Sequence, residues 1–266
     1  MAELTYGSYL ALDEVLGAQH LQSVPPHHDE LLFIVQHQTS ELWFKLMLHE
    51  LRSARAALRA DDLQTALKRT ARVKQIQVTL TEQWSVLGTL TPSEYVEFRE
   101  FLATSSGFQS YQYRAVEFLL GNKNPRMLQV FDSEPGAREL LQTALEEPSL
   151  YDEFLAFLAR AGFPVPPALL SRDVTQPWEF SPELVQVVLG IYQSSGEHWR
   201  YYEACEELVD LEENFQLWRF RHLRTVQRII GLKSGTGGSA GVAFLERALS
   251  QTFFPELYAV RNEIGA

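Results

Sequence analysis

Four short groups of residues in this chain combine side-chain types and spacings that could do chemistry. The first surrounds His222, which falls on a stripe of apolar residues spaced by three or four along segment 215–224. Arg219, Arg221 and Arg224 fall off that stripe. The imidazole is therefore expected to face the core. There it is either a buried histidine bonded to a backbone carbonyl or an axial ligand of a metal or haem.

The second group is Phe33 and His37, one helical turn apart and on the same face as Ser40, Glu41 and Phe44. An apolar ring directly beside a titratable ring is a suitable surface for a flat heteroaromatic ligand. The same pattern also suits a helix interior whose polar residues serve packing. The residues alone leave both interpretations open.

The third group is Tyr95 and Arg99, again four residues apart. An arginine there could hold a carboxylate with two parallel hydrogen bonds, with the tyrosine hydroxyl as a further donor, or it could be an ordinary solvated side chain. The fourth group is segment 234–241, whose four glycines allow the backbone to approach a ligand closely or serve as a flexible linker.

The elements that must position these groups are helices, because apolar residues recur at helical spacing along most of the chain and alternating strand patterns are scarce. The fold class is therefore all-α, and the whole chain, 1–266, is one domain. Thr91, Pro92 and Glu94 mark the clearest helix start, a capping box with proline at the first position. Segment 162–182 is the longest predicted surface connection. The predicted helices span 4–16, 28–59, 63–87, 92–103, 113–120, 138–146, 151–161, 183–193, 197–230, 241–250 and 255–264.

Charge and cysteine content exclude several classes of function. The 266 residues carry a formal charge of −11, with a pI of about 5.2, which argues against nucleic-acid and anionic-membrane partners. Cys205 is the only cysteine, so intrachain disulfides, cysteine-based zinc sites, iron–sulfur clusters and covalently attached haem are excluded. With neither a signal-peptide pattern nor a long apolar run, we expect a soluble cytoplasmic protein.

Two familiar motifs match this sequence only in part, and a third is absent. Segment 237–241 matches the nucleophile-elbow pattern of serine hydrolases, but a helical segment precedes it and neither an Asp nor a His follows it. Segment 231–234 lacks the glycine that a phosphate-binding loop needs before Lys233. A di-iron helical bundle needs Glu-x-x-His pairs, and no histidine here has a Glu three residues before it.

Taken together, the four groups resemble the shorter bacterial form of the tryptophan 2,3-dioxygenase family. The resemblance covers most of the chain and is weakest over 164–196, from which no role is carried over. It is carried by segments 4–10, 33–43, 83–87, 91–99, 105–110, 112–114, 218–222, 235–241 and 253–257.

The resemblance implies an all-α homotetramer, a dimer of dimers, that binds haem b without a covalent link and is active in the ferrous state. It also implies insertion of O2 across the indole C2–C3 bond of L-tryptophan to give N-formyl-L-kynurenine, the first step of the kynurenine pathway. By the same resemblance His222 is the axial ligand of the haem iron. Residues implied to line the haem pocket are Trp84, Ser106 and Gly107.

For the substrate, the resemblance implies that Phe33 packs against the indole and that the catalytic His37 accepts its N–H. It implies that Arg99 holds the substrate carboxylate, with Tyr95 close by, and that Thr236 binds the amino-acid head. It also implies that segment 1–20 packs on a neighbouring subunit and brings Tyr6 to that subunit's substrate. Whether His37 removes a proton or only orients the indole stays open. The alternative function is a non-catalytic helical protein that binds haem or an aromatic amino acid.

Overall fold

The computed structural model describes residues 4–233 and 241–265, and over these residues every regular element is a helix, as the sequence predicts. The α-helices are α1 (Tyr6–Leu10), α2 (Leu12–Leu16), α3 (Glu30–Arg59), α4 (Leu63–Leu87), α5 (Pro92–Arg99), α6 (Tyr111–Leu120), α7 (Pro135–Glu146), α8 (Leu150–Arg160), α9 (Pro167–Leu170), α10 (Pro182–Gln193), α11 (Trp199–Ile230), α12 (Val242–Leu249) and α13 (Pro255–Ala259). Short 3₁₀ helices join them: η1 (Glu100–Leu102), η2 (Gly107–Gln109), η3 (Pro125–Phe131) and η4 (Val260–Asn262).

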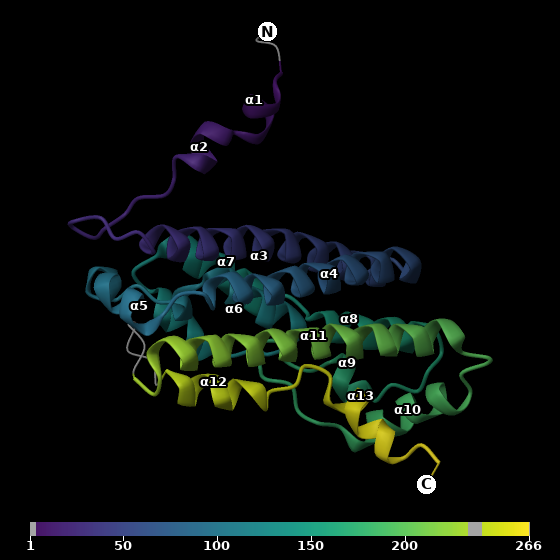
Figure 1. Cartoon of the computed structure of the whole chain (residues 1–266). Helices are drawn as coiled ribbons and strands as arrows, with labels where there is room; N and C mark the ends of the chain where they lie inside the picture. The colour runs from purple at the N-terminus through teal and green to yellow at the C-terminus, as the bar shows by residue number, and fades with distance from the viewer. Residues whose placement is uncertain (1–3, 234–240, 266) are drawn as a thin grey trace.

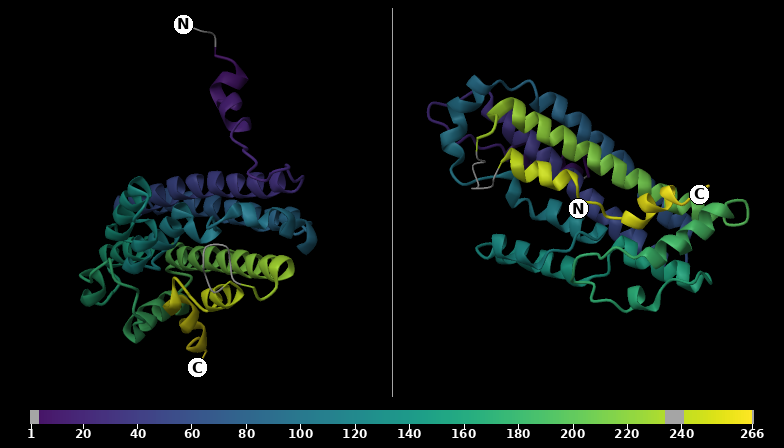
Figure 2. Two further views of the ribbon diagram at one scale, coloured as in Figure 1. Left: turned by 90° about the vertical axis from the view of Figure 1, so that its left-hand side faces the viewer. Right: turned by 90° about the horizontal axis from the view of Figure 1, so that it is seen from below.

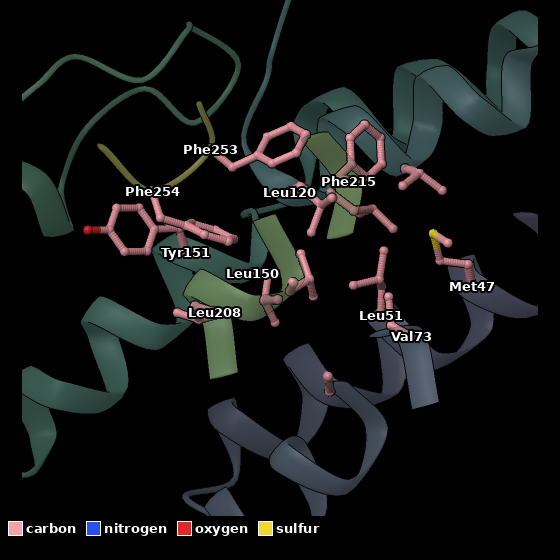
Figure 3. Close-up of a cluster of buried hydrophobic side chains, with 14 of the residues drawn as sticks. Met47, Leu51, Val73, Leu120, Leu150, Tyr151, Leu208, Phe215, Phe253 and Phe254 are labelled. Carbon is pink, nitrogen blue, oxygen red and sulfur yellow. The ribbon is translucent and has the colours of Figure 1, made fainter. Parts of the chain in front are cut away.

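The three long helices α3, α4 and α11 form the centre of the domain, with α4 packed against both of the others (Figure 1). Each buries an apolar stripe, and the stripes meet in one core. Figure 3 shows part of that core, in which side chains of all three helices gather with Phe253 and Phe254 of the C-terminal segment. Among the described residues, no helix combines the length and the apolar character needed to cross a membrane.

The predicted capping box at the start of α5 is confirmed. The Thr91 backbone N–H donates to the Glu94 carboxylate at 2.7 Å, and the Glu94 N–H donates to the Thr91 hydroxyl at 3.4 Å. These bonds satisfy donors that the first helical turn leaves unpaired. They set the phase of α5, so that Tyr95 lies on its buried face.

The N-terminal segment differs from its prediction. The single helix expected over 4–16 is two short helices, α1 and α2, separated at Ala11, whose φ of 49° is left-handed. Both helices project away from the bundle (Figures 1 and 2), and Leu4 and Tyr6 are 74% and 77% exposed. Within this chain the segment has little tertiary packing to keep a helix continuous, and most helical stability comes from such packing.

Two other predictions need correction. The helix expected over 92–103 is α-helical only to Arg99, after which the chain tightens into η1 and ends at Ala103, with φ 48°. The connection expected over 162–182 contains the one-turn helix α9, which starts at a proline. The remaining predicted helices are present, with ends that differ by a few residues and a C-terminal one that is divided into α13 and η4.

Candidate active site

His222 lies on α11 against aromatic side chains, as its place on the apolar stripe predicts. Its ring stacks on Trp84 of α4, with centroids 4.6 Å apart and planes 9° apart, and the Trp218 ring is 5.3 Å away. Burial lowers the pKa of His222 to about 4, so the imidazole is neutral near pH 7. A neutral ring in this position has a nitrogen lone pair that can bind a metal.

Phe33 and His37 form the pair that their spacing on α3 predicts, with ring centroids 4.1 Å apart. The Nδ1 atom of His37 is 2.7 Å from the Phe33 carbonyl oxygen. Because that oxygen can only accept, Nδ1 carries the hydrogen and Nε2 has the free lone pair. Burial also lowers the pKa of His37, so this ring is a neutral hydrogen-bond acceptor near pH 7.

The fold brings these two histidines together although 185 positions separate them in the sequence (222 minus 37). A positive charge on His37 would lower the pKa of His222, so the electrostatics of the two rings are coupled. Phe44 of α3 connects their surroundings, since its ring meets Trp218 edge-on at 6.0 Å. The first and second candidate groups therefore belong to one site.

Tyr95 and Arg99 of α5 join the same site. The Tyr95 ring lies 6.0 Å from the Phe33 ring, and both contact Phe98. Tyr95 is buried, which raises its pKa, while the charge of nearby Arg99 acts in the opposite direction. The Tyr95 ring thus lies close to Phe33, and the partly buried Arg99 is near enough to Tyr95 to act on its pKa; an arginine and a tyrosine can meet the polar end of a bound aromatic molecule.

Comparison with known proteins identifies the family. A family model described as tryptophan 2,3-dioxygenase matches residues 1–165 and 180–264. The chain belongs to the tryptophan 2,3-dioxygenase family.

Relatives named tryptophan 2,3-dioxygenase are similar to the chain over nearly its full length. The protein of Arthrobacter sp. strain FB24 is 66% identical over 264 residues, 99% of this chain and 93% of the relative. That of Saccharopolyspora erythraea is 67% identical, with 98% and 93% covered, and that of Kineococcus radiotolerans is 68% identical, with 99% and 92% covered. The family model leaves out 166–179, inside the stretch where the resemblance is weakest.

The side chains around His222 fit the haem that the family implies. The donor is a neutral imidazole in contact with two flat rings, Trp84 and Trp218, and Phe44 packs against Trp218 in turn. The Nε1 atom of Trp84 is buried and has no hydrogen-bond partner among the described residues. A large planar group with a polar edge would supply both the ring contacts and a partner for such a donor.

The other residues expected at the site are not brought into it by the described contacts. Ser106 caps η2, its hydroxyl accepting from the Phe108 N–H at 3.3 Å, and Gly107 is exposed, so their role toward a haem stays a prediction. Thr236 lies outside the described residues. Tyr6 lies on the exposed α1, apart from the rest of the site in this single chain.

The apolar-stripe pattern gives a wrong prediction for Arg219, which lies one turn before His222. Arg219, expected off the buried stripe like Arg221 and Arg224, is only 3% exposed and pairs with Glu117 of α6. Arg221 and Arg224 are exposed, as expected. Periodicity fails at Arg219 because it ranks residues by hydropathy, and a buried arginine is stable only with a buried partner, here from a distant helix.

Proposed function

We propose that the chain is a haem-dependent dioxygenase that inserts O2 across the indole C2–C3 bond of L-tryptophan and forms N-formyl-L-kynurenine. One observation carries the proposal in a chain of this family. Two neutral imidazoles, His37 and His222, lie within electrostatic reach of each other, with an apolar ring beside one and a paired tyrosine and arginine nearby.

His222 would hold the haem iron through an imidazole nitrogen, and Trp84, Ser106 and Gly107 would line the haem pocket. When bound as non-covalent ferrous haem b, this group supplies the binding and activation of dioxygen. The chain's own contribution is to keep His222 neutral by burial and to hold its plane by the stack on Trp84. A charged imidazolium could not donate to iron.

The substrate would lie against Phe33, with its indole N–H directed at Nε2 of His37. That nitrogen is the acceptor because Nδ1 is committed to the Phe33 carbonyl. Arg99 would hold the carboxylate with its planar fork of donors, the Tyr95 hydroxyl lies close by, and Thr236 would bind the amino-acid head. Together these contacts would hold the indole ring of the substrate in one orientation relative to the haem iron.

His37 need not act as a strong base. The C2–C3 bond of indole is electron-rich, so the N–H proton does not have to leave before the bond reacts with dioxygen. A neutral His37 can accept a hydrogen bond that strengthens as positive charge develops on the indole nitrogen. The lowered pKa of His37 agrees with this role, because it disfavours a full positive charge on the ring.

The assembly would be a homotetramer, a dimer of dimers, in which segment 1–20 packs on a neighbouring subunit. The projecting segment exposes large apolar side chains, which water disfavours and a subunit interface would bury. They are Leu4, Tyr6, Tyr9, Leu10, Val15 and Leu16. In this arrangement Tyr6 contacts the substrate of the adjacent subunit.

The test is an absorption spectrum of the purified, haem-supplied and reduced protein, followed by addition of L-tryptophan in air. We expect a haem band and the appearance of formylkynurenine. A haem band without product would favour the alternative, a non-catalytic helical protein that binds haem or an aromatic amino acid. That alternative is not favoured, because relatives with 66–68% identity over nearly the whole chain are named as the enzyme.

A further inference from the structure

A buried cluster of charged side chains joins α6 to α11 next to the candidate site. Glu117 of α6, 2% exposed, is at its centre. Its Oε1 accepts from Arg219 Nη2 at 2.8 Å and from the Tyr113 hydroxyl at 3.1 Å, and its Oε2 accepts from Arg114. The Arg219 side chain is 3% exposed, and its guanidinium lies 4.8 Å from the Phe215 ring and 5.1 Å from the Phe253 ring.

The cluster acts on the helix turn that carries His222. At about 100° per residue, His222 lies roughly 40° around α11 from Trp218 and 60° from Arg219. His222 thus lies one turn after these two residues, at an angle between them around the helix axis. Other parts of the chain hold the side chains of both residues in place. Trp218 is held by rings on other helices, 5.7 Å from Trp84 and 5.2 Å from Tyr113, while Arg219 is held by the Glu117 carboxylate.

Two anchors on either side of His222 determine the rotation of α11 about its axis at this point. The ring contacts of Trp218 would allow α11 to shift slightly, because such contacts are not strongly directional. The charge-assisted hydrogen bond between Arg219 and Glu117, at 2.8 Å, has a defined length and direction. Arg219 Nη1 adds a second bond at 3.0 Å to the Gln251 carbonyl, so its guanidinium is fixed at both ends. The direction of the His222 Cα–Cβ bond follows from this rotation.

The charges of the cluster make Glu117 indispensable to it. Two buried guanidinium groups, Arg114 and Arg219, share one carboxylate, and the Nε atom of each has no hydrogen-bond partner within the described part of the chain. Loss of Arg219 would leave a balanced pair of Arg114 and Glu117. Loss of the Glu117 charge would leave two buried cations with no counter-ion, which is the more costly state.

We propose that Arg219 and Glu117 are positioning residues for His222: their buried ion pair sets the rotation of α11 one turn before the histidine and so directs its imidazole toward a haem iron. This rests on the proposed role of His222 as the iron ligand. Neither side chain touches the reacting atoms, and their effect passes through the backbone of α11.

The experiment compares three variants of the full chain: Arg219→Met, Arg219→Lys and, as a matched control, Arg172→Met. Arg172 is a mostly buried arginine, with its side chain 14% exposed, bonded to Asp152 at 2.7 Å and lying 5.0 Å from the Trp178 ring. It has no described contact with a residue of the candidate site. The measurements are the haem dissociation constant of the haem-free protein, the iron–histidine stretching frequency of the ferrous form and the thermal midpoint without haem.

We expect Arg219→Met to weaken haem binding by about 10- to 100-fold, the usual effect of removing a residue that orients a metal ligand, and to shift the iron–histidine frequency. Arg219→Lys keeps the charge and should recover part of both. Arg172→Met should lower the thermal midpoint and leave haem affinity and the frequency as in the parent.

The inference is overturned if Arg219→Met lowers only the thermal midpoint, as the control does, and haem affinity and frequency stay unchanged. Should Arg219→Met fail to fold, Arg219→Lys decides by the same two measurements. His222→Ala separates this result from a failure of the proposed function. If that variant keeps haem at parental affinity, the ligand role of His222 and this inference both fail; if it loses haem while Arg219→Met does not, only this inference fails.

Discussion

His37 and His222 are both partly buried, and burial lowers the pKa of each, yet the chain holds the two rings differently. The His37 ring is bonded to its own helix through Nδ1 and the Phe33 carbonyl, at 2.7 Å. The His222 ring is stacked on Trp84 and, within the described residues, makes no hydrogen bond.

The difference separates two uses of a neutral imidazole. A hydrogen bond to a carbonyl selects one tautomer, so His37 offers a single lone pair, on Nε2, in a known direction. Stacking holds the plane of His222 but commits neither of its nitrogens. The first arrangement suits a group that accepts a substrate proton in a hydrogen bond, and the second suits a metal ligand.

The largest effect is expected where the proposed ligand itself is removed. His222→Ala should lose haem and all turnover, because none of the other side chains described around the site offers an imidazole to replace it except His37, which is committed elsewhere. Haem content by absorption and formylkynurenine production are the measurements. His49→Ala, at an exposed histidine of α3, is the control and should behave as the parent. Full haem in the His222 variant would contradict the assignment.

His37→Ala should impair the reaction and not abolish it. A hydrogen bond to a neutral acceptor contributes about 0.5–1.5 kcal/mol, so kcat/KM for L-tryptophan should fall by about 2- to 13-fold. With 1-methyltryptophan, which has no indole N–H, parent and variant should have similar kcat/KM. Complete loss of activity with L-tryptophan would instead identify His37 as an obligatory base.

Acid should destabilise the haem-free protein through His222. Its pKa falls from an ordinary 6.5 to about 4 on folding, so the unfolded chain binds the additional proton between these values. The contribution of this group to stability is therefore complete above about pH 6.5 and declines as the pH falls toward 4. Urea unfolding from pH 7 to 4 measures the slope. His222→Phe, which keeps a flat apolar ring, should have a shallower slope, and equal slopes would refute the buried neutral state.

The smallest effect is expected for Trp84→Phe. Trp84→Phe keeps a ring for His222 to stack on and removes an Nε1–H that has no partner among the described residues. The free energy of unfolding without haem should change by less than about 1.5 kcal/mol, since only part of the ring area is lost. Trp84→Ala, which removes the stack, should cost about 3–5 kcal/mol by urea unfolding. A large loss in the Phe variant would mean that the indole N–H, and not the stack, holds this part of the site.

Local patterns predicted the parts of the site that lie within one helix. The pairs Phe33–His37 and Tyr95–Arg99 follow from a four-residue spacing, and the inward direction of His222 follows from its apolar stripe. Periodicity could not bring the three helices together, and the roles of these residues toward tryptophan and haem come from family resemblance. Those roles stay predictions.

Lys123 illustrates a feature that no local pattern indicates. It is 1% exposed, and its Nζ donates to the carbonyl oxygens of Ala144, Leu145 and Glu147 at the end of α7. Lysine is almost always exposed, so sequence patterns place it at the surface. Burial lowers its pKa to about 7, and only the carbonyl groups of a helix end brought close by the fold make the buried position possible.

The sequence by itself determined the helical class, the start of α5 and which candidate side chains of α3, α5 and α11 share a face, because each depends on bonds and spacings within a few residues. Only the tertiary structure decided that the segment expected as one helix over 4–16 breaks at Ala11 and that Arg219 is buried against Glu117. It also decided that α3 meets α11 near the two histidines, where the Phe44 ring packs against Trp218. The break at Ala11 reflects a segment with little tertiary packing, whereas the burial of Arg219 and the meeting of α3 with α11 depend on partners far away in the chain, whose positions are set by the packing of the whole core.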